Sequence, residues 1–111
     1  MPDAYATVPN PTVKEGSGFT ATAYFRNGST GEAPTTAKYR VDCLTTGKNL
    51  TGWTSLSVAE SINISITATE NAIQDQNNRT ERKQLTVAAD PDTSTQTRDS
   101  VLWEVENIRG L

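Results

Sequence analysis

Histidine is absent from this sequence of 111 residues. Histidine is the commonest general base in enzymes and the commonest ligand for transition metals, so Ser-His and Cys-His nucleophiles are excluded. Carboxylate pairs remain, but glycosidase chemistry needs two of them across a cleft, which a domain of this length hardly offers. We therefore expect no enzyme activity and no cofactor. The carboxylates in question are those of Asp90, Asp92, Asp99, Glu104 and Glu106.

The Asp90-x-Asp92 pair is the one candidate for a metal site. Its oxygen atoms are of the kind that calcium prefers. Asp and Pro are also the residues that a hairpin turn requires, and Pro91 lies between the two carboxylates. The turn explains the pattern more simply, so we expect no metal.

Cysteine occurs once, at Cys43, so no disulfide can form within the chain. A small domain without a disulfide depends on packing alone, which fits a reducing cytoplasm or assembly inside one. Cys43 shares the alternation of Tyr39 and Val41, which predicts a small core residue rather than a nucleophile.

Long apolar runs and a concentration of positive charge are also missing. No apolar run approaches the roughly 20 residues that span a bilayer, and the first residues lack the pattern of a signal peptide. We therefore expect no membrane partner and no export by the general secretory route. The net charge of -3 is spread along the chain. Nucleic-acid binders gather Lys and Arg on one surface, so a nucleic-acid partner is not expected either.

The residues that are present favour β-strands. Only 34% of the residues are hydrophobic, and threonine, which is β-branched and favours strands, fills much of the deficit. Apolar and polar residues alternate in short segments that turn residues separate, with no helix-period segment between them. We predict strands at 12–14, 19–26, 36–45, 50–58, 61–67, 79–90 and 96–108.

The alternation also predicts which side chains form the core. In 61–67 it is strictest, and a slip of one residue would expose all three isoleucines. The less regular segment 50–58 carries Trp53, Leu56 and Val58, and we expect Trp53 in the core, because a lone tryptophan in a core short of large residues is usually its anchor. The other expected core residues are Phe19, Ala21, Ala23, Phe25, Tyr39, Val41, Ile62, Ile64, Ile66, Leu85, Val87, Ala89, Val101, Trp103 and Val105.

Two segments fall outside this pattern. Residues 1–11 contain three prolines and little periodicity, which predicts an extended N-terminal arm or an edge segment before a domain at 12–111. Such an arm could pair with a neighbouring subunit, or be a partly disordered terminus. In 69–78 we expect a single helical turn plugged by Ile73, followed by a solvated loop.

The order of signals from Tyr39 to Asp90 resembles that of fibronectin type III and related immunoglobulin-like domains. The shared features are Tyr39-x-Val41, a tryptophan region after it, a Ser-x-x-Ile strand and Leu85-x-Val87-x-Ala89. The chain departs from these families at Phe25, where they have tryptophan, and at Leu85, where they often have tyrosine. The resemblance implies an all-β fold: a single antiparallel β-sandwich of about seven strands.

The whole chain also resembles small immunoglobulin-like virion proteins of tailed bacteriophages, through its threonine-rich strands and the segments 33–42 and 51–56. This resemblance implies a non-enzymatic structural protein of the virion, acting in capsid decoration or at the head-to-tail neck. Its partners would be phage capsid, portal or tail proteins. It would be present in many copies and assembled in the host cytoplasm.

We expect partner contacts in the N-terminal arm and two loops, since strand addition at an exposed edge needs only main-chain groups. An alternative is a carbohydrate- or cell-surface-binding module in which Trp53 or Trp103 stacks on a sugar. A host-directed or intracellular adaptor is a third possibility. The expected partner-binding residues are Pro2, Tyr5, Val8, Pro9, Pro11, Asn27, Gln74 and Asn77.

Overall fold

The computed structural model describes residues 3–90 and 96–108. Within these residues the chain is all-β, with nine strands and no helix. The strands are β1 (Asp3–Thr7), β2 (Thr12–Lys14), β3 (Phe19–Asn27), β4 (Thr30–Gly31), β5 (Ala37–Cys43), β6 (Lys48–Leu56), β7 (Ser61–Ile66), β8 (Thr80–Ala89) and β9 (Thr97–Glu106).

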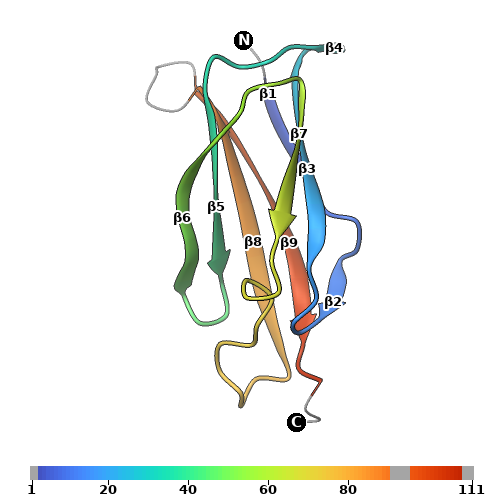
Figure 1. Cartoon of the computed structure of the whole chain (residues 1–111), viewed down its shortest axis with the longest axis vertical. Coiled ribbons are helices and arrows are strands. Elements are labelled where there is room, and N and C mark those ends of the chain that lie inside the picture. Colours follow the sequence, from blue (N-terminus) through green and yellow to red (C-terminus); the bar gives the residue numbers. More distant parts are fainter. Residues whose placement is uncertain (1–2, 91–95, 109–111) are drawn as a thin grey trace.

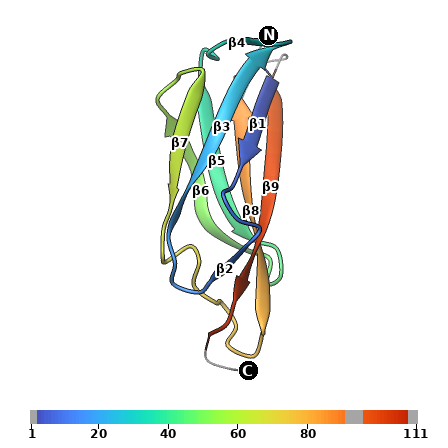
Figure 2. The same cartoon turned by 90° about the vertical axis from the view of Figure 1, so that its right-hand side faces the viewer.

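The strands form two sheets, which lie as separate layers in Figures 1 and 2. In the four-stranded sheet, β1 pairs with one edge of β3, while β7 and the short β4 pair with the other edge. The five-stranded sheet has the order β2-β9-β8-β5-β6. All pairs are antiparallel except β2 with β9, which run parallel. The predicted fold class is confirmed at the level of an all-β, sandwich-like architecture.

The core lies between the sheets and follows the alternation that the sequence predicts. Most of the expected core residues are buried, and Cys43 is buried among them. Four others are only half-buried and pack at its border: Phe19, Tyr39, Ile62 and Val101. Alanines supply much of the four-stranded sheet's inner face, so its backbone packs closely on the larger side chains opposite. The main core residues are Ala4, Ala6, Ala21, Ala23, Phe25, Val41, Ile64, Ile66, Leu85, Val87, Ala89, Trp103 and Val105.

The structure does not confirm an extended N-terminal arm. Strand β1 pairs with β3 over five residues, from Asp3 with Arg26 to Thr7 with Thr22. Ala4 and Ala6 are buried in the core, and the backbone N–H of Ala6 donates to Oδ2 of Asp99 at 2.8 Å. The described part of the expected arm is therefore an edge strand and a short connection within the domain.

The connection between β7 and β8 closes one end of the core. The predicted single turn is present: the N–H of Asn71 donates to the carbonyl of Thr67 at 3.1 Å, and Ile73 is buried. The Glu70 carboxylate accepts from the backbone N–H of Thr67 at 2.8 Å and from the Thr51 hydroxyl at 2.6 Å. These bonds fasten the connection to the end of β7 and to β6.

A buried ion pair lies beneath this connection. Glu81 and Lys83 are fully buried on β8, and Nζ of Lys83 lies 3.2 Å from Oε1 of Glu81. Lys83 also donates to the carbonyl of Ala72 at 2.9 Å, and the thiol of Cys43 lies 3.8 Å from the same Glu81 oxygen. Both charges are thus compensated inside the core, as buried charges must be.

Glu81 also organises the loop that follows. Its carboxylate accepts the backbone N–H groups of Gln74 at 2.6 Å and Asp75 at 2.9 Å, and the amide of Asn78 at 3.0 Å. Burial on its own raises the pKa of this carboxyl, but the hydrogen bonds from the loop and from Lys83 outweigh it and hold the pKa below its ordinary value. The ionised form of Glu81 therefore stabilises the folded loop.

Candidate functional site

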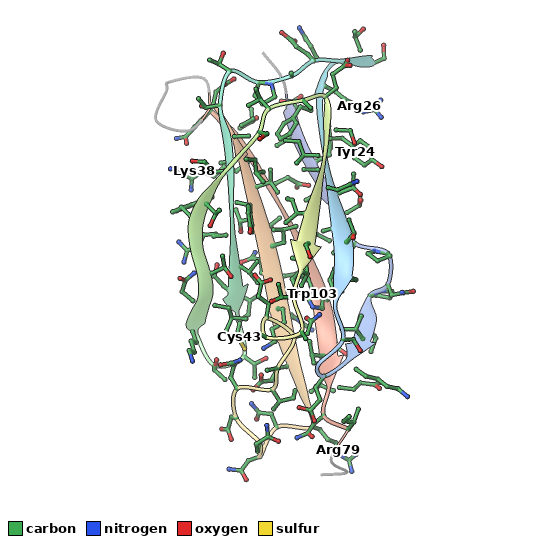
Figure 3. The ribbon with its side chains drawn as sticks, viewed as in Figure 1. Tyr24, Arg26, Lys38, Cys43, Arg79 and Trp103 are labelled. Atoms are coloured by element: carbon green, nitrogen blue, oxygen red, sulfur yellow. The ribbon has the colours of Figure 1, made fainter. Side chains whose placement is uncertain are left out.

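The residues expected to bind a partner do not form one surface. The molecule is elongated, with extents of 46, 24 and 19 Å. Asn27 is exposed at the turn from β3 to β4, next to Arg26 at one end in Figure 3. Gln74 and Asn77 belong to the β7–β8 connection, which lies at the opposite end with Arg79.

The remaining expected contact residues lie near the N-terminus. Tyr5 is 45% exposed on β1, while Val8 is half-buried against the core. Pro9 and Pro11 are exposed in the connection from β1 to β2, and Pro2 lies outside the described residues. Gln74 is engaged within the domain, because its N–H binds Glu81. Of this set, Tyr5 offers the largest exposed apolar side chain.

A different surface is centred on Trp53, and the prediction that Trp53 lies in the core is wrong. Trp53 is 36% exposed, and Val58, close to it in sequence, is 44% exposed. The physical reason lies in the period of a strand. Side chains alternate between the two faces of a strand, so residues whose positions differ by an odd number point to opposite faces. Trp53 and Leu56 differ by three positions. Leu56 packs against the core, so Trp53 points outward.

Two irregularities in the pairing of β5 with β6 shape this surface. The register shifts between Tyr39 and Val41 and again between Val41 and Asp42, so that Arg40 lies opposite the bulged part of β6. The Asn49 side chain supports the bulge by donating to the carbonyls of Val41 at 3.3 Å and Thr51 at 3.0 Å. Bulges re-aim side chains, and this one sets Trp53 beside the cations of β5.

Three cationic side chains surround the Trp53 ring. Their charged groups lie 5.1 Å (Lys38), 5.5 Å (Arg40) and 5.3 Å (Arg98) from the ring centroid. Each distance is within the range of a cation–π interaction. The cations come from β5 and β9, so the cluster extends across the outer face of the five-stranded sheet. We call Lys38, Arg40, Trp53 and Arg98 the Trp53 platform.

Ala88 shows how the platform sits on the sheet. It pairs in register with Lys38 on one side and Arg98 on the other, on the outward side of β8. It is nevertheless fully buried. A small side chain at this position leaves room for the larger ones beside it, and we infer that the platform covers it.

Asp42 orients one member of the platform. Its carboxylate binds the Arg40 guanidinium through two hydrogen bonds of 2.9 and 2.8 Å, and it accepts the Asn49 amide at 2.9 Å. Burial raises the pKa of Asp42, but these bonds outweigh it and lower the pKa, while the hydrogen bond to Asp42 raises that of Arg40. The paired geometry fixes the plane of the guanidinium beside the indole.

The second tryptophan is unavailable to a ligand. Trp103 is 1% exposed, and its ring meets that of Phe19 edge-on with centroids 5.3 Å apart. Its Nε1–H donates to Oδ1 of Asn71 at 2.8 Å. Trp103 is therefore a core residue, as the alternation predicts, and a stacking role is left to Trp53.

Other candidate chemistry is absent from the described residues. They contain no group of three or more Cys, Asp or Glu side chains placed to hold a metal ion. Asp90 accepts the backbone N–H groups of Thr35 at 2.7 Å and Thr36 at 3.1 Å, while Asp92 lies outside the described residues. The hollows of the described surface are open, such as one of about 290 Å³ that Thr86, Arg98 and Ser100 help to line.

Comparisons with known proteins give no further guide to this site. No family model, no curated protein and no solved structure matches the chain. In the described part of the chain, no helix is long and apolar enough to cross a membrane.

Proposed function

We propose that this chain is an immunoglobulin-like β-sandwich. The strand order supports this proposal. In immunoglobulin domains strands A, B and E share one sheet, and strands C, F and G share the other. Here β1, β3 and β7 have the order of A, B and E, while β5, β8 and β9 have that of C, F and G, with β6 in the position of C′. The parallel pairing of β2 with β9 corresponds to an initial strand that crosses from one sheet to the other.

The proposed activity is non-enzymatic protein binding through the Trp53 platform. The single observation that carries it is the exposed indole held between Lys38, Arg40 and Arg98 on the outer face of the five-stranded sheet. Trp and Arg are among the residues most enriched at the interface positions where replacement by alanine weakens protein–protein binding most. Side chains mounted on a sheet are also more rigid than those on loops, so less entropy is lost on binding.

We further propose that this binding serves a bacteriophage virion, as capsid decoration or at the neck. The sequence resemblance to small virion proteins supports it, as do the missing histidine and the single buried cysteine, which suit a purely structural role. Capsid, portal or tail proteins would then be the partners. Many copies of the chain would be held by repeats of the same contact.

The test is incorporation into particles. The gene is expressed together with its neighbouring genes, particles are purified, and copies per particle are counted by quantitative mass spectrometry. We expect Trp53→Ala to lower the copy number about tenfold or more, as loss of a central aromatic contact does. Leu102→Ala is the matched control, because Leu102 is also an exposed apolar residue of the five-stranded sheet, 43% accessible. A chain that is missing from particles would refute the virion role, and full incorporation of Trp53→Ala would refute the platform.

Carbohydrate binding is a second candidate, and the exposure of Trp53 is the observation that favours it. A neutral sugar stacks on an open ring face, whereas here three cations lie within 5.5 Å of the ring centroid. A glycan array read with the wild-type chain and with Trp53→Ala tests this directly. Binding that requires Trp53 would favour the sugar module over the protein-binding one.

A further inference from the structure

We propose that the partner of the Trp53 platform is an acidic, extended peptide segment that adds to the sheet as a strand beside β6. This inference rests on the proposed protein-binding function and names the chemistry of the partner. Three features carry it: the position of β6 at an edge, the place of Trp53 on that edge, and the charge around the indole.

β6 is the last strand of the five-stranded sheet. It has nine residues, Lys48–Leu56, and pairs with β5 on one side, while no described strand pairs with it on the other. An edge strand of this length presents a row of backbone donors and acceptors that another chain can use. Its side chains are mostly exposed, so little protein has to move before a second strand can approach.

Trp53 lies on the edge strand itself, within this row. Neighbouring strands are about 4.8 Å apart, and side chains on one face recur about every 6.8 Å along a strand. A strand added to β6 would therefore set alternate side chains directly beside the indole, on the outer face of the sheet. The main-chain bonds and the platform contacts would then form together.

The charge of the platform selects the kind of segment. Lys38, Arg40 and Arg98 gather on one face of a chain whose net charge is -3. Asp42 offsets the charge of Arg40, and the Asp99 carboxylate, next to Arg98 in sequence, is bound to the N–H of Ala6 in the other sheet. Cations grouped around an exposed indole favour a segment that carries carboxylates over one that carries lysine or arginine.

A peptide fits these observations better than a sulfated glycan or a nucleic acid. All three would satisfy the positive charge, but only a polypeptide strand has backbone N–H and carbonyl groups that match the edge of β6. Protection of the β6 backbone is thus the feature that separates the three ligands.

The experiment is an NMR titration of the ¹⁵N-labelled chain with defined probes. The main probe is an eight-residue peptide that alternates Glu and Thr. A Lys-Thr peptide of the same length, a heparin oligosaccharide and a single-stranded oligothymidylate serve as comparisons. We expect the Glu-Thr peptide to shift the Trp53 indole N–H and to slow hydrogen exchange of edge amides in β6, with an affinity that falls as salt is added.

Two controls separate charge from strand addition. The double variant Lys38→Gln and Arg98→Gln is expected to weaken peptide binding about tenfold. Arg82→Gln, which removes an exposed charge elsewhere on β8, is expected to leave it unchanged. Two further Glu-Thr peptides carry methyl groups on every second backbone nitrogen, one on the Glu residues and the other on the Thr residues. Each keeps the charge but loses the N–H donors along one of its edges. One of these two peptides should no longer bind.

The outcomes decide the proposal. Equal binding by both methylated peptides would overturn strand addition, and no effect of the Glu-Thr peptide on β6 and Trp53 would overturn the acidic partner. Heparin or oligothymidylate binding at Trp53, with the peptide inactive, would assign the platform to that polyanion. If incorporation into particles still depends on Trp53 in any of these cases, the proposed protein-binding function survives and only the partner chemistry is wrong.

Discussion

The indole N–H of Trp103 donates to the side-chain oxygen of Asn71, and both residues are buried. Asn71 also donates through Nδ2 to the carbonyl of Ser17, so the amide joins the β7–β8 connection to β9 and to the connection between β2 and β3. In the described structure no buried side-chain nitrogen or oxygen lacks a hydrogen-bond partner. One amide thus holds together three segments that are distant in sequence.

Trp103→Phe removes this donor and leaves the Asn71 oxygen without it in the core. We expect a loss of about 2 to 4 kcal/mol in the free energy of unfolding, from the missing hydrogen bond and the smaller ring. Urea unfolding followed by circular dichroism measures it. Trp53→Phe is the matched control, and as a surface change it should cost less than about 1 kcal/mol. Equal effects of the two variants would contradict the assignment of Trp103 to the core.

Glu81 should make the stability of the domain sensitive to acid. The folded pKa of its carboxyl is lowered below the ordinary value, so the unfolded chain takes up the proton first as the pH falls. The contribution of Glu81 is therefore complete above its unfolded pKa and is lost as the pH drops through the lower folded value. The urea concentration at the midpoint of unfolding, measured from pH 7 to pH 3, shows how steeply the stability of the domain falls with pH.

Glu81→Gln is expected to be less stable at pH 7 and to show a shallower loss of stability in acid. Asp42, whose pKa is also lowered, keeps part of the slope in both proteins. Glu104→Gln, at an exposed pair with Arg82, is the control and should cost less than about 1 kcal/mol at pH 7. A Glu81→Gln variant with an unchanged acid profile would show that Glu81 is not the group responsible.

The two tryptophans should differ in their accessibility to acrylamide. Trp53 is 36% exposed and Trp103 is 1% exposed, so the wild-type Stern–Volmer plot should curve downward as one emitter is quenched and the other is protected. In Trp53→Phe the remaining emission should be quenched only weakly, because Trp103 is almost completely buried. Strong quenching of that variant would contradict the buried position of Trp103.

Asp90 should be a structural residue of the β8 end rather than a calcium ligand. It adopts a positive φ of 48°, and its carboxylate accepts the N–H groups of Thr35 and Thr36. Asp90→Ala loses both bonds and strains the backbone, so we expect a loss of about 2 kcal/mol. Asp90→Asn tolerates this φ and keeps one acceptor, so thermal unfolding should show a smaller effect. A rise in melting temperature with added calcium in the wild type alone would overturn this role.

Strand alternation predicts much of the architecture, because the period of two depends only on neighbouring residues. It places Phe25, Ile64 and Val87 in the core correctly. The same period also indicates that Glu81 and Lys83 point to the same face of β8 as Leu85. Both are buried despite their charge. It also puts Trp53 outside, where the general preference of tryptophan for cores is misleading.

The rest depends on contacts that alternation cannot reveal. Arg98 reaches Trp53 only because β9, β8, β5 and β6 are adjacent in that order, and strand order is a property of the whole sheet. The bulges of β5 and β6 are similarly set by pairing. Strand β1 (Asp3–Thr7) is difficult to predict from the sequence, because prolines flank it and its inward residues are only alanines. Such weak apolar contrast gives little periodic signal.

The bond between the Ala6 N–H and the Asp99 carboxylate bears on how copies of this chain would behave at high local concentration. Exchange of β1 between neighbouring copies would have to break this bond, separate the five pairs with β3 and bring Ala4 and Ala6 into water. An inward-pointing charge on a sheet margin also discourages further pairing there. In a crowded array each copy would therefore keep its own first strand, and neighbours would associate without domain swapping.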